Sequence, residues 1–125
     1  DTKHLDTLSE LLGKEAMNKI RLDYVADSAE KMQRLLVAWQ TKNYEEIGQV
    51  SHSLKSSSAN MSLPFFAAQC QIIEQAAFQQ QEEGIQEAID QLPELYEKSL
   101  QALADYFSNE WRYAGFTLTN ESPLI

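Results

Sequence analysis

Apolar residues recur along the chain at steps of three and four, which is the spacing of one face of an α-helix. One long stripe lies in the last third of the sequence and comprises Ile85, Ile89, Leu92, Tyr96, Ser99, Leu103 and Tyr106. Pro93 falls inside it and should remove one backbone hydrogen bond, yet the stripe keeps its phase on both sides. The pattern therefore predicts one kinked helix rather than two separate helices.

Four earlier segments show the same periodicity. We expect a short helix over Leu5–Leu12, a long helix over Lys14–Thr41 and a third over Tyr44–Asn60. A fourth follows a turn in which Ser62 suits the N-cap and Pro64 the first helical turn. The residues expected on the apolar faces are, in chain order, Leu5, Leu8, Leu11 and Leu12; Met17, Ile20, Tyr24, Ser28, Met32, Leu35 and Trp39; Ile47, Val50, Leu54 and Met61; and Phe66, Cys70, Ile73 and Ala77, with Phe65 and Ile72 beside them.

Glycine and proline, which break helices, are scarce: the 125 residues include four and three of them. Long amphipathic helices joined by short connections pack best as antiparallel neighbours. We therefore predict an all-α fold, an antiparallel up-down-up-down four-helix bundle with a short extra N-terminal helix. The length suits one domain, which we assign to residues 1–110. Periodicity is lost after Asn109, so residues 111–125 are expected to form a C-terminal tail.

The charge balance excludes several classes of partner. The chain has 10 Lys and Arg against 19 Asp and Glu, a net charge of −9. Nucleic acid and anionic membrane surfaces need a basic face, so neither is an expected partner. No apolar run approaches the roughly 18 residues of a membrane span, and no signal peptide is visible. We expect a cytoplasmic domain. Its start at Asp1 rather than Met favours a segment of a longer protein, and a free-standing cytosolic protein is the alternative.

Cysteine and histidine are too few for common metal sites. Cys70 is the single cysteine, which excludes an internal disulfide, and its place on an apolar stripe predicts a buried, unreactive thiol. His4 lies near the start of the chain and is expected to be solvated. The two histidines have no further ligands at recognisable spacing, so no metal site is predicted.

His52 is the residue best placed to take part in a reaction. On a helical wheel it lies nearly opposite the apolar stripe of its helix and so should face solvent. Gly48 and Ser56, four residues before and after it, are small and leave the ring accessible. An imidazole titrates near neutrality and is a nucleophile when neutral, and Lys55, three residues on, could offset the charge of an arriving phosphoryl group. If only the spacing of His52 and Lys55 is considered, the alternative is that His52 faces solvent and has no functional role.

The longer stretch 52–62, His-Ser-Leu-Lys-Ser-Ser-Ser-Ala-Asn-Met-Ser, resembles the signature of histidine phosphotransfer (HPt) domains. That signature reads roughly His-x-Leu-Lys-Gly-Ser-small-x-x-hydrophobic-Gly. Segments 35–38 and 43–47 resemble the family's helix–turn–helix before the histidine. Segment 70–76 resembles its next helix, with the typical acidic or amide residue at Glu74. The resemblance covers about Leu5–Phe107 and departs at Ser56 and Ser62, where the family often has glycine.

The resemblance implies a helical bundle with one exposed histidine that carries a phosphoryl group between receiver-domain aspartates in multistep two-component relays. By this analogy His52 accepts the group through Nε2 and Lys55 stabilises the phosphoryl oxygens. Glu74, or Gln71 one turn earlier, would bond Nδ1–H. Such domains bind no ATP and need no cofactor of their own, and the receiver supplies Mg²⁺. The chain is expected to be a monomer, either free-standing or the last module of a membrane-bound hybrid sensor kinase, and to dock receivers through its second and third helices around His52.

Two other functions are alternatives to phosphotransfer. An adaptor bundle that binds a partner through one helical face needs only the amphipathic helices, but it leaves the outward His52 and its neighbours unexplained. A histidine kinase dimerisation domain uses a helical-hairpin dimer. There an acidic residue commonly follows the histidine, whereas Ser53 follows it here.

Overall fold

The computed structural model describes the backbone of residues 2–113 and the side chains of residues 2–108. It contains five α-helices, which are α1 (Lys3–Leu12), α2 (Lys14–Gln40), α3 (Tyr44–Asn60), α4 (Pro64–Phe78) and α5 (Glu82–Tyr113). No strand occurs among these residues, so the all-α prediction is confirmed. Across the same range, no helix has the length and apolar character needed to span a membrane.

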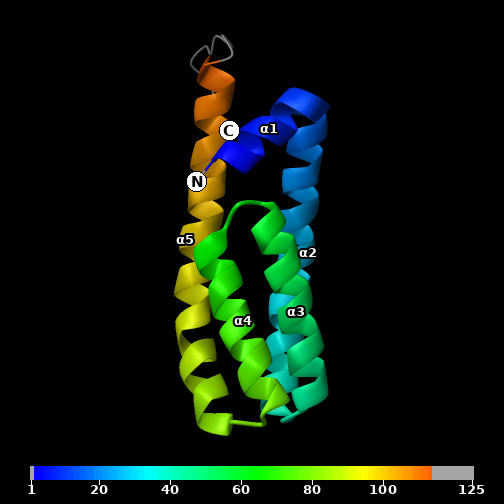
Figure 1. Cartoon of the computed structure of the whole chain (residues 1–125), viewed down its shortest axis with the longest axis vertical. Helices are drawn as coiled ribbons and strands as arrows, with labels where there is room; N and C mark the ends of the chain where they lie inside the picture. Colours follow the sequence, from blue (N-terminus) through cyan, green and yellow to red (C-terminus); the bar gives the residue numbers. More distant parts are fainter. Residues whose placement is uncertain (1, 114–125) are drawn as a thin grey trace.

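Helices α2 to α5 lie lengthwise beside one another, and α1 crosses one end of the assembly between α2 and α5 (Figure 1). Each of α2, α3 and α4 packs against the helix that follows it in the chain. The colour gradient of Figure 1 shows that consecutive helices run in alternating directions, as their short connections require. The Tyr106 hydroxyl donates to Asp6 Oδ1 at 2.6 Å and so ties α5 to α1.

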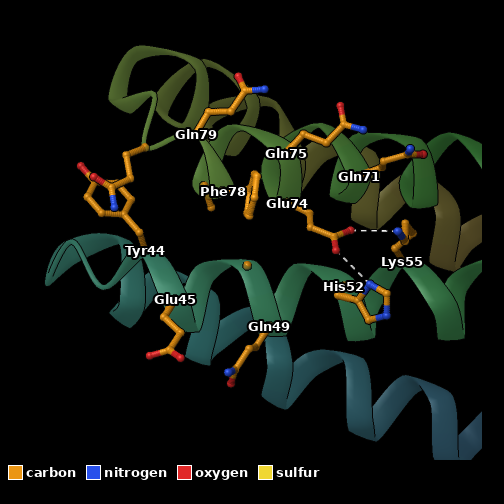
Figure 2. A pocket seen from close by; sticks show the side chains of 13 residues that line it. Tyr44, Glu45, Gln49, His52, Lys55, Gln71, Glu74, Gln75, Phe78 and Gln79 are labelled. Carbon is orange, nitrogen blue, oxygen red and sulfur yellow. Dashed lines mark hydrogen bonds and ion pairs between the residues drawn. The ribbon is translucent and has the colours of Figure 1, made fainter.

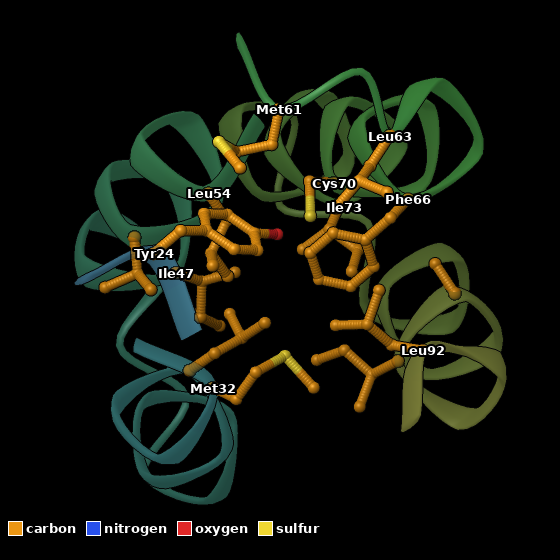
Figure 3. Close-up of a cluster of buried hydrophobic side chains, with 14 of the residues drawn as sticks. Tyr24, Met32, Ile47, Leu54, Met61, Leu63, Phe66, Cys70, Ile73 and Leu92 are labelled. Atoms are coloured by element: carbon orange, nitrogen blue, oxygen red, sulfur yellow. The ribbon is translucent and has the colours of Figure 1, made fainter. Parts of the chain in front are cut away.

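The core forms where the apolar stripes of these helices meet (Figure 3). Leu35, Ile47, Leu54, Phe66 and Ile73 are fully buried, each from a predicted stripe. Polar members of the stripes form hydrogen bonds across helices. Tyr24 Oη lies 2.7 Å from Ser58 Oγ, a buried serine outside the predicted stripe of α3, and Ser28 Oγ lies 2.7 Å from Tyr96 Oη.

Several residues assigned to apolar faces are exposed instead, namely Leu11, Leu12, Ile20, Phe65 and Ile72. The prediction was wrong for these residues because periodicity shows which face of a helix is apolar. It does not show how much of that face the neighbouring helices cover. Helix α1 crosses the bundle end and buries only Leu5, so its last turn extends beyond the contact.

Helices α2, α3 and α4 end in the same hydrogen-bonded motif. In each, the residue after the C-cap is a non-glycine residue with positive φ: Lys42 at 54°, Ser62 at 59° and Gln80 at 54°. The next amide then donates back to the carbonyl five residues earlier, in the 6→1 bond of a Schellman motif. These three bonds are Asn43 N to Ala38 O at 2.8 Å, Leu63 N to Ser58 O at 2.9 Å and Gln81 N to Ala76 O at 2.8 Å. Ser62 therefore closes α3 and is not the N-cap of α4, which is Leu63.

Replacing Ser62 with glycine should stabilise the fold by about 1 kcal/mol, because glycine adopts positive φ without the clash that Cβ causes. The same replacement at Ser56, an exposed position inside α3, should destabilise it by about 0.5 kcal/mol, because glycine disfavours helix interiors. Urea unfolding of the two variants would measure both changes. Shifts of the same sign would contradict the assignment of Ser62 to a left-handed turn.

Some helix ends agree with the ends predicted from the sequence, and others differ. Helix α3 has the predicted bounds, and its Asn43 cap accepts from Glu46 N at 3.1 Å. Helix α5 is continuous through Pro93, as expected. It also extends to Tyr113, so the predicted domain end at residue 110 falls inside a helix. No glycine or proline occurs between Pro93 and Gly115 to end it earlier. The rest of the predicted tail, 114–125, lies outside the described residues.

Candidate functional site

His52 lies in the third turn of α3 and points away from the core. Its side chain is 60% exposed, whereas Ile47, Val50 and Leu54 on the opposite face are buried. Gly48 is half-buried and Ser56 exposed, so neither covers the ring. The position of His52 follows from the local periodicity of α3, because a residue opposite an apolar stripe must face outwards.

Glu74 of α4 joins His52 to Lys55 (Figure 2). Its Oε2 lies 2.9 Å from His52 Nδ1, and its Oε1 accepts from Lys55 Nζ at 2.8 Å. An ionised carboxylate only accepts hydrogen bonds, so Nδ1 must carry the proton in this contact. In the neutral ring the other nitrogen, Nε2, then holds the free lone pair. Figure 2 shows that nitrogen on the side of the ring away from Glu74.

The pKa of Glu74 reflects two opposing effects. Partial burial raises this pKa, but the hydrogen bonds from Lys55 and His52, and the electrostatic interactions with both side chains, together lower it below the ordinary value of 4.5. At neutral pH the group is therefore a carboxylate. This is the form that can accept both contacts.

The lowered pKa of Glu74 makes its contribution to stability depend on pH. Because the folded pKa lies below the unfolded one, the carboxylate stabilises the fold above about pH 4.5, and this contribution is lost as the pH falls through the folded pKa. Replacing Lys55 with Met removes one hydrogen bond and one charge, so it should raise the pKa of Glu74. A carbon-13 NMR titration of the side-chain carboxyl would measure it. Lys98→Met, which alters an exposed pair with Glu94 on α5, is the matched control, and equal titrations in the two variants would contradict the assignment.

The other predicted site residues lie close by but hold different contacts. Gln71 is exposed and lines the same groove, yet Glu74, one turn further along α4, makes the Nδ1 contact. Lys55 is 28% exposed, and its ammonium group is bound to Glu74. Its action on phosphoryl oxygens stays a prediction.

A groove of about 1080 Å³ runs from His52 along the boundary between α3 and α4. Its lining comes from these two helices and from the connection after α4: Tyr44, Glu45, Gly48, Gln49, His52, Lys55, Gln71, Glu74, Gln75, Ala77, Phe78, Gln79 and Gln80. No residue of α2 lines it. The hollow beside His52 therefore faces α4, which sequence reasoning did not foresee. The nearest signal was Phe78, a large apolar residue off the α4 stripe.

The remaining candidates lie away from this site. Cys70 is fully buried, as predicted, and burial raises the pKa of its thiol to about 12, which leaves it unreactive at neutral pH. His4 is exposed on α1. Within the part of the chain that the structure describes, no three His, Cys, Asp or Glu side chains gather as ligands for a metal ion.

Comparison with known proteins gives one family and one similar structure. The model of the Hpt domain family matches residues 19–104. The crystal structure of histidine-containing phosphotransfer protein B (HptB) from Pseudomonas aeruginosa PAO1 is similar, with a TM-score of 0.81 and 21% identity over 87% of this chain and 94% of that one. At this identity the likeness shows the fold alone. A search of curated proteins found no match.

The family match spans most of the chain and includes both helices that form the site. Hpt domains are phosphotransfer intermediates rather than kinases, and their partners are receiver domains. The chain is therefore a member of the Hpt domain family, and its function is histidine phosphotransfer in two-component phosphorelay signalling.

Proposed function

We propose that His52 is the phosphoryl acceptor, which takes the group from an aspartyl phosphate of one receiver domain and passes it to the aspartate of another. The observation that supports this most is the contact between His52 Nδ1 and the Glu74 carboxylate, together with the 60% exposure of the imidazole. A nucleophile in phosphoryl transfer must reach the phosphorus in line with the leaving oxygen, which demands an accessible and oriented nitrogen.

In the proposed reaction the Nε2 lone pair of His52 attacks phosphorus. The bond between phosphorus and the receiver's aspartate oxygen breaks, and the aspartate leaves as a carboxylate. The ring gains positive charge as the N–P bond forms, and the proton stays on Nδ1, where Glu74 accepts its hydrogen bond. Return transfer reverses these steps, so the same contact serves both directions.

Lys55 is proposed to stabilise the phosphoryl oxygens. Its Nζ lies 2.8 Å from Glu74 Oε1, and Glu74 Oε2 contacts His52, so one carboxylate holds the cation beside the reacting ring. Lysine is a flexible point charge that can move between acceptors by rotating its stem. Gln71, on the same rim of the groove, is proposed as a second polar partner for the incoming group.

We further propose that α2 to α5, as an antiparallel up-down-up-down bundle with α1 as its extra helix, form the functional unit. It is proposed to work as a monomer, because its apolar stripes are largely consumed inside one chain. It is also proposed to have no ATP site of its own and to receive phosphoryl groups only from receiver domains. Mg²⁺, which neutralises charge in phosphoryl transfer, is expected to be bound by the receiver. The domain is proposed to act in the cytoplasm, alone or attached to a hybrid sensor kinase.

The test is transfer from a receiver alone. The chain is mixed with a receiver domain phosphorylated by a small donor, and with Mg²⁺ but no ATP or kinase. We expect label to move to the chain and back to a fresh receiver. A chain that binds receivers but never carries label would be an adaptor bundle, and the proposal would be wrong.

A further inference from the structure

We infer that the groove between α3 and α4 is the docking site of the receiver domain, and that it seats an apolar side chain of the receiver over Gly48. The inference rests on the proposed function, because it assigns a surface to the partner of His52. The groove is one continuous hollow, and its lining includes both His52 of α3 and Phe78 of α4 (Figure 2).

The hollow beside His52 exists because Gly48 has no side chain. Tyr44, Gly48 and His52 are spaced four residues apart on α3 and so form one row along the helix. A Cβ atom placed on Gly48 would meet no atom within 4 Å, so the space above it is open. Tyr44 and His52 bound this space on either side. The row therefore presents a socket directly next to the reactive ring.

The opposite wall of the groove belongs to α4 and carries the features of a docking surface. Phe78 is 88% exposed, and such a large apolar side chain gains free energy when a partner covers it. Gln71, Gln75 and Gln79, again four residues apart, line the same wall. Their amides are uncharged donors and acceptors, which suit the polar rim around an apolar anchor.

We assign the groove between α3 and α4 to the receiver domain, because the receiver must cover His52 to deliver its phosphoryl group. Tyr44 lies eight residues from His52, or about 12 Å along the axis of α3. A standard interface buries about 800 Å² on each partner, an area roughly 30 Å across. A receiver whose interface is centred on His52 therefore also reaches the Tyr44 end of the groove. Docking was expected to use the second and third helices, and the groove adds α4 to that surface.

The experiment measures phosphotransfer from a purified receiver domain of the source organism at increasing receiver concentration. The probe is the receiver that labels the parent chain best. Phe78→Ser removes the exposed ring, and Gly48→Met fills the socket. Each should raise the receiver concentration for half-maximal transfer about tenfold, equivalent to about 1.4 kcal/mol of binding free energy, and leave the saturating rate unchanged. Phe65→Ser, also on α4 and 78% exposed but outside the groove, is the matched control and should change neither quantity.

The outcomes separate the two proposals. If no receiver labels the parent chain, the proposed function and the docking site both fail. If the parent is labelled but Phe78→Ser and Gly48→Met half-saturate at the parent's concentration, the docking site alone is wrong. A fall in the saturating rate without a change in half-saturation would also overturn it. So would a parent dimer in sedimentation that Phe78→Ser converts to monomer, because a second copy would then occupy the groove. Circular dichroism checks that each variant stays helical.

Discussion

Replacing His52 with Gln is expected to abolish phosphoryl acceptance. The parent chain, labelled by a phosphorylated receiver, should carry a single phosphoryl group that is lost in acid and stable in alkali, as a phosphoramidate is. Glutamine offers no nucleophilic ring nitrogen, so the variant should carry no label at any receiver concentration. The readout is the acid-labile, alkali-stable label retained on the chain after separation from the receiver.

The His52→Gln variant should remain folded, which makes the loss interpretable. The side chain is 60% exposed, so its replacement leaves no cavity in the core. Lys55 still donates to Glu74 in the variant, so α3 and α4 keep one of their two polar links at this point. His4→Gln is the control, because His4 lies exposed on α1, and it should label like the parent. Alkali-stable label on His52→Gln would show that another residue accepts the group.

The largest expected change in stability comes from Phe66. Its side chain is fully buried, and its ring centroid lies 5.2 Å from that of Tyr96, which links α4 to α5. Phe66→Ala should lower the free energy of unfolding by about 3–5 kcal/mol, because it removes buried apolar surface and leaves a cavity. This loss is a large share of the roughly 5–15 kcal/mol that stabilises a typical small domain.

The neighbouring residue provides the matched control for this prediction. Phe65 is the same residue type on the same helix but is 78% exposed. Phe65→Ala should therefore change the free energy of unfolding by no more than about 0.5 kcal/mol. Urea unfolding at one pH and temperature would measure both variants. Comparable losses would mean that Phe65 is buried in solution and that the rotation of α4 differs from the one described here.

Phe65 and Phe66 also mark a limit of prediction from sequence. Phe66 lies on the apolar stripe of its helix, and Phe65 sits beside it, so the pattern alone assigned both to the interior. Only Phe66 is buried, where its ring packs against Tyr96 of α5, and Phe65 is largely exposed. The width of the buried face depends on how closely the neighbouring helices approach, and this is a property of the packed bundle. The same reason explains Leu11 and Leu12, which continue the periodicity of α1 beyond its contact with the bundle.

The partners of His52 likewise show what the sequence can predict and what helix packing decides. Gln71 and Glu74 lie one turn apart on α4, and either could reach Nδ1 if α4 were rotated or shifted against α3. Their spacing could not decide between them. Packing of α4 on α3 brings Glu74 to 2.9 Å from Nδ1 and also to Lys55, a second contact that was not anticipated.

The sequence by itself determined the all-α class, the bounds of α3 and the outward position of His52, because these follow from periodicity and capping within one segment. The tertiary structure decided the contact of Glu74 with both His52 and Lys55, the groove over Gly48 and the exposure of Phe78. Each of these depends on how far α4 is turned and displaced against α3. That placement is fixed by the interlocking of side chains from helices distant in sequence, which no local pattern encodes.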